Sequence, residues 1–92
     1  MPKNLTFNFH LVPRFHELIT DQKESCHRDY AIGTSTKGEG QDKCREKCNT
    51  NAECNFYFFT LDTNGWCELY KACDKKRTTA ISGSTFWKIG NS

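Results

Sequence analysis

Hydrophobic and polar residues alternate over several short stretches of the chain, a pattern that is typical of strands. Residues 5–11 read LTFNFHL and alternate as a half-buried strand does, before Pro13 ends the pattern. The run NFYFFTL at residues 55–61 predicts a second strand, with aromatic residues on both faces. Because such a segment aggregates when it is exposed, we expect it in the middle of a sheet.

A hairpin is predicted directly after this aromatic strand. The turn is DTNG at residues 62–65, because Asn-Gly accepts the positive φ angles of a two-residue type I′ turn at little cost. The returning strand is WCELYKAC at residues 66–73. In this register Phe59 lies opposite Tyr70.

The clearest helix begins at Gln41 and ends at Asn49 or Asn51, with Asp42 in its first turn, where a negative charge suits the helix dipole. Cys44 and Cys48 are four residues apart, so both thiols leave the same face. We expect that face to cover the hairpin, with Phe56 and Phe58 packed beneath the two cysteines.

Shorter elements are predicted in the rest of the chain. They are a helical turn at 15–19, a strand at 30–32, a loop rich in Gly, Ser and Thr at 33–40, a basic connector (DKKRTT) at 74–79, a Gly-Ser turn after it and a closing strand at 85–89. Phe86 and Trp87 point to opposite faces of the closing strand, so one of them should be buried.

Composition narrows the class of protein. The chain has 92 residues, enough for one small domain with a marginal core, and it contains six cysteines. Small domains with this profile are usually secreted and held by disulfides. The net charge of +2 makes no general case for nucleic-acid or membrane binding. We therefore expect a secreted or cell-surface protein that binds no nucleic acid.

No targeting or membrane segment is visible in the sequence. The N-terminal stretch lacks an apolar run of signal-peptide length, so we expect any secretion signal to have been removed. Nothing approaches the roughly 18 apolar residues of a membrane span, and we expect no membrane insertion. Asn4-Leu5-Thr6 matches the N-glycosylation pattern.

Three roles for the cysteines compete. Zinc sites usually show paired cysteines separated by a longer loop, and the gaps here are irregular. Redox catalysis normally needs Cys-x-x-Cys at a helix N-terminus, which is absent. Disulfides fit best, and spacing alone leaves fifteen pairings open. Geometry favours a short loop between Cys48 and Cys54 and a bridge from Cys44 to Cys67, which leaves the remaining two cysteines for each other.

The order of cysteines and aromatics resembles the PAN/apple family. The run C-x3-C-x5-C-x-F-x-F starts at Cys44 and is followed after eight residues by CELY. The resemblance covers about residues 24–90. It implies an α+β fold in which a single helix packs on a curved antiparallel sheet, and it implies the nested disulfides Cys26–Cys73, Cys44–Cys67 and Cys48–Cys54. Residues 24–92 would form this domain, and residues 1–23 an N-terminal extension that adds a strand.

Members of this family are mainly recognition modules in adhesins, lectins, growth factors and protease zymogens. The resemblance therefore implies an extracellular, non-enzymatic module that binds carbohydrate or protein ligands, with a role in cell adhesion. We expect no cofactor, and the irregular cysteine spacing leads us to expect no metal site. The contrasting hypothesis is a secreted toxin or protease inhibitor, a common use of disulfide scaffolds. Its rigid exposed loop would have to be residues 33–40, and glycine makes that segment a poor rigid ligand.

Two surfaces are candidates for ligand binding. The predicted hairpin register places an aromatic set on the face away from Cys67, and aromatic faces suit sugar rings. The alternative is that this set belongs to the core. A basic set around residues 71–77 would suit sulfated glycans or an acidic protein, and its alternative is an ordinary solvated loop. The aromatic set is Tyr57, Phe59, Trp66 and Tyr70; the basic set is Lys71, Lys75, Lys76 and Arg77.

Catalytic chemistry finds little support. The three histidines, His10, His16 and His27, show no serine or cysteine partner arrangement. His16 and Glu17 are adjacent, and adjacent residues on a helix do not face each other. There is no glycine-rich phosphate loop and no paired-carboxylate motif. We expect that the protein is not an enzyme.

Overall fold

The computed structural model describes residues 14–89. The strand predicted at residues 5–11, His10 and the glycosylation pattern at Asn4 lie outside the described residues. The elements in chain order are β1 (Arg14–Cys26), the 3₁₀ helix η1 (Arg28–Tyr30), β2 (Ala31–Thr36), α2 (Gln41–Thr50), β3 (Phe56–Thr60), β4 (Cys67–Tyr70) and β5 (Lys76–Ile89).

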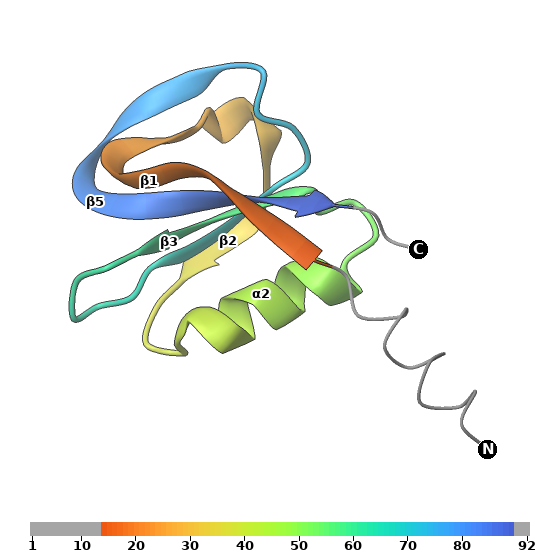
Figure 1. Cartoon of the computed structure of the whole chain (residues 1–92), viewed down its shortest axis with the longest axis horizontal. Coiled ribbons are helices and arrows are strands. Elements are labelled where there is room, and N and C mark those ends of the chain that lie inside the picture. Colours follow the sequence, from red (N-terminus) through yellow and green to blue (C-terminus); the bar gives the residue numbers. More distant parts are fainter. Residues whose placement is uncertain (1–13, 90–92) are drawn as a thin grey trace.

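The five strands form one antiparallel sheet in the order β1-β5-β3-β4-β2. The α-helix α2 lies against one face of this sheet and contacts β3 and β4 (Figure 1). The aromatic strand β3 is central, as predicted, because β4 and β5 cover both of its edges. The expected class, one helix packed on an antiparallel sheet and stapled by disulfides, is confirmed for residues 14–89.

The three disulfides are Cys26–Cys73, Cys44–Cys67 and Cys48–Cys54, and no free cysteine remains. The nested pairing is thus confirmed. Because all six thiols are oxidised, none is available as a metal ligand or a redox pair.

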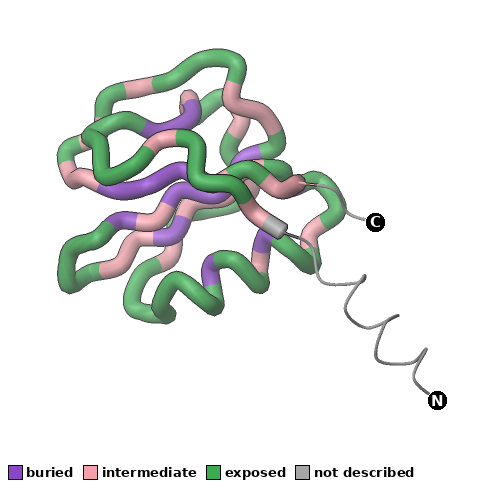
Figure 2. The backbone as a smooth tube through the Cα atoms, in the orientation of Figure 1, coloured by how far each residue is buried: buried purple, intermediate pink, exposed green. Residues whose placement is uncertain are grey.

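The helix α2 is fastened by its cysteines rather than by a hydrophobic stripe. Cys44 and Cys48 are its only buried residues (Figure 2). Its N-terminus begins after Gly40, which offers no side-chain cap. The pairs Arg45–Asp42 and Lys43–Glu46 are both exposed and 3.7 Å long, so they add little stability.

A long ribbon of β1 and β5 forms the other side of the molecule. Residues 83–87 of β5 pair with β3, whereas residues 76–78 pair only with the end of β1. Register shifts interrupt β1 between Glu17 and Glu24, and β5 bends sharply along its length (Figure 1). The first part of β5 therefore leaves the plane of the central strands and curls over the face opposite α2.

This ribbon overturns several local predictions. Residues 15–19 are strand and not a helical turn, because short apolar runs fit both periods and pairing with β5 decides between them. Residues 76–79 of the basic connector and the whole of the Gly-Ser turn are also part of a strand, β5. Residues 14–23, the described part of the expected N-terminal extension, belong to β1 and pair with β5.

Two apolar clusters lie on opposite faces of the sheet. Beneath α2, Tyr57 packs with the disulfides and with half-buried Phe59 and Phe86. On the other face, Phe58 and Tyr70 pack with Cys26 and half-buried Phe56. The prediction that Phe56 and Phe58 lie under the helix is wrong, because strand alternation gives that face to their odd-numbered neighbours.

The closing pair of aromatics divides as alternation requires. Phe86 stacks on Tyr57, with ring centroids 4.7 Å apart, and is half-buried. Trp87 is on the other face and is 41% exposed. Phe86 is therefore the residue of the pair that joins the core.

Candidate functional site

The predicted aromatic surface does not form. Phe56, and not Phe59, lies opposite Tyr70 in the hairpin, and Phe59 lies opposite Cys67. Tyr57 and Phe59 consequently share the helix face with Cys67, whereas Tyr70 points to the opposite face. Tyr57 and Tyr70 are each 1% exposed. The structure thus places these two tyrosines in the core, and the face that the four aromatics were expected to share is a wrong prediction.

The physical reason is the turn between β3 and β4. Asp62 organises a longer loop: its Oδ1 accepts hydrogen bonds from Thr60 Oγ1 at 2.7 Å and from Gly65 N at 3.2 Å. Gly65 has φ +58°, but Asn64 does not have a positive φ, so no type I′ turn forms. The hydrogen bond from Thr60 is the main cause that lowers the pKa of Asp62.

The predicted basic surface loses its arginine. Lys71, Lys75 and Lys76 are exposed. Arg77 instead turns inward, where its Nη2 donates to Glu68 Oε1 at 2.9 Å, and its side chain is 24% exposed. Three lysines are left on that surface, and the four-cation patch is wrong as predicted.

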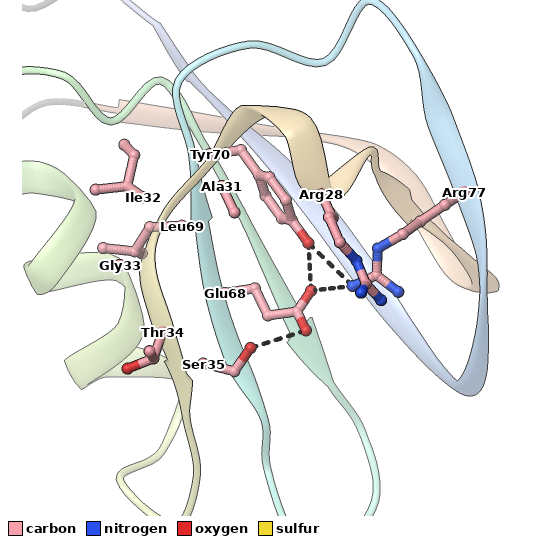
Figure 3. Close-up of a pocket in the computed structure, with 10 residues that line it drawn as sticks. All are labelled: Arg28, Ala31, Ile32, Gly33, Thr34, Ser35, Glu68, Leu69, Tyr70 and Arg77. Carbon is pink, nitrogen blue, oxygen red and sulfur yellow. Dashed lines mark hydrogen bonds and ion pairs between the residues drawn. The ribbon is translucent and has the colours of Figure 1, made fainter.

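A groove lies between the β2–β4 edge and the curled part of β5. It consists of two adjoining hollows of about 400 and 310 Å³, which share Ser35, Glu68 and Arg77. Figure 3 shows the larger hollow, where side chains of η1, β2, β4 and β5 meet. The smaller hollow has an apolar wall formed by Phe58, Trp66 and Ile81. Of the predicted aromatic set, Trp66 lines the smaller hollow and Tyr70 lines the larger one.

Glu68 is the centre of a hydrogen-bond network in this groove. Its Oε1 accepts from the Tyr70 hydroxyl and from Arg77, and its Oε2 accepts from Ser35 Oγ at 3.0 Å (Figure 3). Arg77 Nη2 also donates to the Tyr70 hydroxyl at 3.3 Å. The carboxylate is 18% exposed, so it is held in a partly desolvated site where its ion pair with Arg77 is stronger than one in water.

The fold explains how these residues meet. β4 and β5 are not neighbours in the sheet, because β3 lies between them. Arg77 reaches Glu68 only because the start of β5 curls over β3, and the Cys26–Cys73 bridge holds the chain just before that point. The network therefore depends on the bend in β5.

One local signal for Glu68 was present in the sequence. Cys67 bonds to the helix, so its neighbour Glu68 has to face the opposite side of the strand. No such signal exists for Arg77, which lies in a run of charged and polar residues, or for Ser35 in its glycine-rich segment.

Two buried tyrosines should make the domain sensitive to alkali. Burial raises the pKa of Tyr57 and of Tyr70, and the hydrogen bond to Glu68 raises the second further. A phenol whose pKa is higher in the folded state than in the unfolded state stabilises the folded protein. This contribution is complete at pH values below the pKa in the unfolded state, about 10, and is lost as the pH rises through the pKa in the folded state. We expect the urea midpoint to fall above about pH 10.

The Tyr57→Phe variant is the matched control. Among the described residues, the Tyr57 hydroxyl accepts one long hydrogen bond, from Gln41 Nε2 at 3.4 Å. Removal of this hydroxyl should therefore cost little stability at neutral pH. The variant should lose less stability than the parent between neutral and alkaline pH, measured by urea unfolding, with phenolate absorbance as the second readout. Parallel pH curves for the two proteins would contradict this assignment.

Other chemistry-bearing groups lie apart from the groove. His27 Nδ1 accepts a hydrogen bond from Asp29 N at 3.1 Å, and His16 is exposed on β1. The described residues contain no group of three or more histidine, cysteine, aspartate or glutamate side chains placed to hold a metal ion. Within residues 14–89, no helix has the length and apolar character needed to cross a bilayer.

Comparison of the chain with protein-family models, with curated proteins and with solved structures found no match.

Proposed function

We propose that this chain is an extracellular, non-enzymatic recognition module of the PAN/apple type, with a role in adhesion, and that it binds carbohydrate in the groove beside Glu68. The observation that carries the proposal is the composition of the groove. One wall presents Trp66 and Ile81, and the other presents the hydroxyl, carboxylate and guanidinium groups of Ser35, Glu68 and Arg77.

This pairing of walls suits a sugar. A pyranose ring offers C–H groups that stack on an aromatic face and hydroxyls that need both donors and acceptors. The hollows, at about 400 and 310 Å³, are at the small end of the range for ligand sites. Lys37 Nζ lies 5.2 Å from the Trp66 ring centroid and helps to fix the position of that ring.

Two further observations support an extracellular setting and a binding role. Three disulfides persist in oxidising compartments and are rare in reducing ones. The groove is held by the Glu68 network and by a disulfide close to β5, so it is largely formed before a ligand arrives, which lowers the cost of binding.

A glycan array combined with a Trp66 substitution tests the proposal. We expect binding to a restricted set of glycans, and a loss of about tenfold or more in affinity for Trp66→Ala, because stacking and burial on the ring are lost. In a Trp87→Phe background, the fluorescence of Trp66 should change on glycan binding.

Leu61→Ala is the matched control, since Leu61 is in the same turn, is 57% exposed and does not line the groove. It should bind as the parent does. An array without any bound glycan, or equal losses for Trp66→Ala and Leu61→Ala, would argue against a carbohydrate site in this groove.

A further inference from the structure

The larger hollow contains two guanidinium groups and one carboxylate. Arg28 from η1 and Arg77 from β5 both line it, and Figure 3 shows their guanidinium groups pointing to the same end of the hollow. Glu68 is the only acidic residue that lines either hollow. The two arginines and one glutamate therefore give this end of the groove a net charge of +1.

Glu68 is already committed to Arg77 and its neighbours. Its two oxygens accept hydrogen bonds from Tyr70, Arg77 and Ser35. Among residues 14–89, Arg28 forms no ion pair with any carboxylate, and its neighbour Asp29 faces His27 at 3.4 Å instead. The second arginine thus has no anionic partner in the described part of the chain.

Arg77 itself has donors left over. Its hydrogen bonds to described residues all run through Nη2. Its Nε is buried without a partner, and an unpaired buried donor on a charged group is costly. Nη1 also has no partner among the described residues but is not buried, so it can donate to an acceptor that enters from the groove.

The backbone that carries Arg28 is firmly placed, although the side chain is exposed. Tyr30 N donates to His27 O at 3.0 Å, and His27 N donates to Lys75 O at 2.8 Å. The adjacent Cys26–Cys73 bridge fixes the start of the segment. A ligand that binds Arg28 would therefore have to order one side chain and not a loop.

We propose that this end of the groove binds the negatively charged group of an acidic saccharide, a carboxylate or a sulfate held between Arg28 and Arg77. The inference rests on the function proposed above and names its ligand class. Guanidinium groups suit both anions, because their donors form charge-assisted hydrogen bonds with planar or tetrahedral oxyanions. The sugar ring would extend toward Trp66 in the adjoining hollow.

The test compares matched neutral and acidic glycans. An array would carry lactose and N-acetyllactosamine, each in neutral, sialylated and sulfated form, together with heparin and chondroitin sulfate oligosaccharides. We expect the acidic forms to bind about tenfold more tightly than the neutral form of the same scaffold. Amide NMR spectra should place the bound acidic glycan at Ser35 and Arg77.

Two variants, each of which removes one positive charge, distinguish binding at a specific site from general electrostatic attraction between the protein and an acidic glycan. Arg28→Gln should abolish most of the preference for the acidic form. Lys43→Gln, on the exposed face of α2, should leave it unchanged. Sodium sulfate and sodium acetate serve as competitors, and sulfate alone should displace the acidic glycan only at much higher concentration.

The possible results discriminate between the two proposals. Neutral and acidic forms that bind the groove equally, or equal losses in Arg28→Gln and Lys43→Gln, would overturn the acidic subsite and leave the carbohydrate groove intact. Free sulfate that competes as well as the glycan would overturn the assignment to a saccharide. An array on which no glycan of either kind binds would overturn both.

Discussion

Simultaneous replacement of Cys44 and Cys67 by alanine is expected to lower the free energy of unfolding by roughly 3 kcal/mol and to release the helix. The bridge closes a loop of 23 residues, which sets the chain-entropy contribution. The helix has little else to hold it, because Cys44 and Cys48 are its only buried residues. A domain of this size has a small stability margin, so we expect the variant to unfold near body temperature.

Urea unfolding followed by far-ultraviolet circular dichroism measures this effect. The double variant Cys48→Ala, Cys54→Ala is the matched control, because it also removes one disulfide of the helix. That disulfide closes a loop of only six residues, so we expect its removal to lower the free energy of unfolding by roughly 2 kcal/mol. A midpoint that does not move when Cys44 and Cys67 are replaced would show that the helix is held by contacts other than its disulfide.

A single methyl group at Gly83 is expected to destabilise the fold by about 2–3 kcal/mol or more. A Cβ at this position would lie 2.6 Å from Phe58 Cζ and 2.6 Å from the backbone oxygen of Phe59. The ring could shift only by disturbing the cluster opposite the helix, and the carbonyl belongs to the central strand. Gly83→Ala therefore forces β5 away from β3 at the point where the two strands pair.

Two variants isolate this steric effect. Gly38→Ala meets no atom within 4 Å, but its φ of +82° makes the substitution strained, and we expect it to cost about 1–2 kcal/mol. Ser82→Ala, beside Gly83, should change stability little. If thermal unfolding of Gly83→Ala matched that of Ser82→Ala, the close approach of β5 to the aromatic strand would be wrong.

Local signals in the sequence predicted the parts of the fold that local interactions determine. The i,i+4 cysteines and the charged residues around them predicted α2, and the aromatic run predicted a central strand. The disulfide pairing followed from the helical face and the resemblance together. Each of these rests on residues that are close in the chain or on a covalent bond.

Long-range pairing determined the parts that sequence reasoning missed. The Asn64-Gly65 signal for a two-residue turn was outweighed by the Asp62 side chain, and the resulting register exchanged the faces of Tyr57 and Phe56. The strand at residues 14–26 exists because it pairs with β5, which lies fifty or more residues later in the chain. Nothing in the local pattern distinguishes it from a helical turn.

The groove was the least accessible part, for the same reason. Arg77 appeared to belong to a solvated basic segment, and only the bend of β5 brings it to Glu68. The role of Arg77 depends on the way β5 passes over β3. The pattern of hydrophobic and polar residues does not predict such a crossing. Of the residues proposed from the sequence, Trp66, Tyr70 and Arg77 line the groove, whereas Tyr57, Phe59 and the three lysines do not.

The outward side of α2 offers a handle for work on this molecule. Arg45 and Asn49 point to solvent on a helix that lies across the sheet from Glu68. A biotin or dye attached to a residue substituted at either position, without reduction of the disulfides, would leave the groove facing solution on a sensor chip. The geometry that staples the helix thus also determines how the protein should be immobilised.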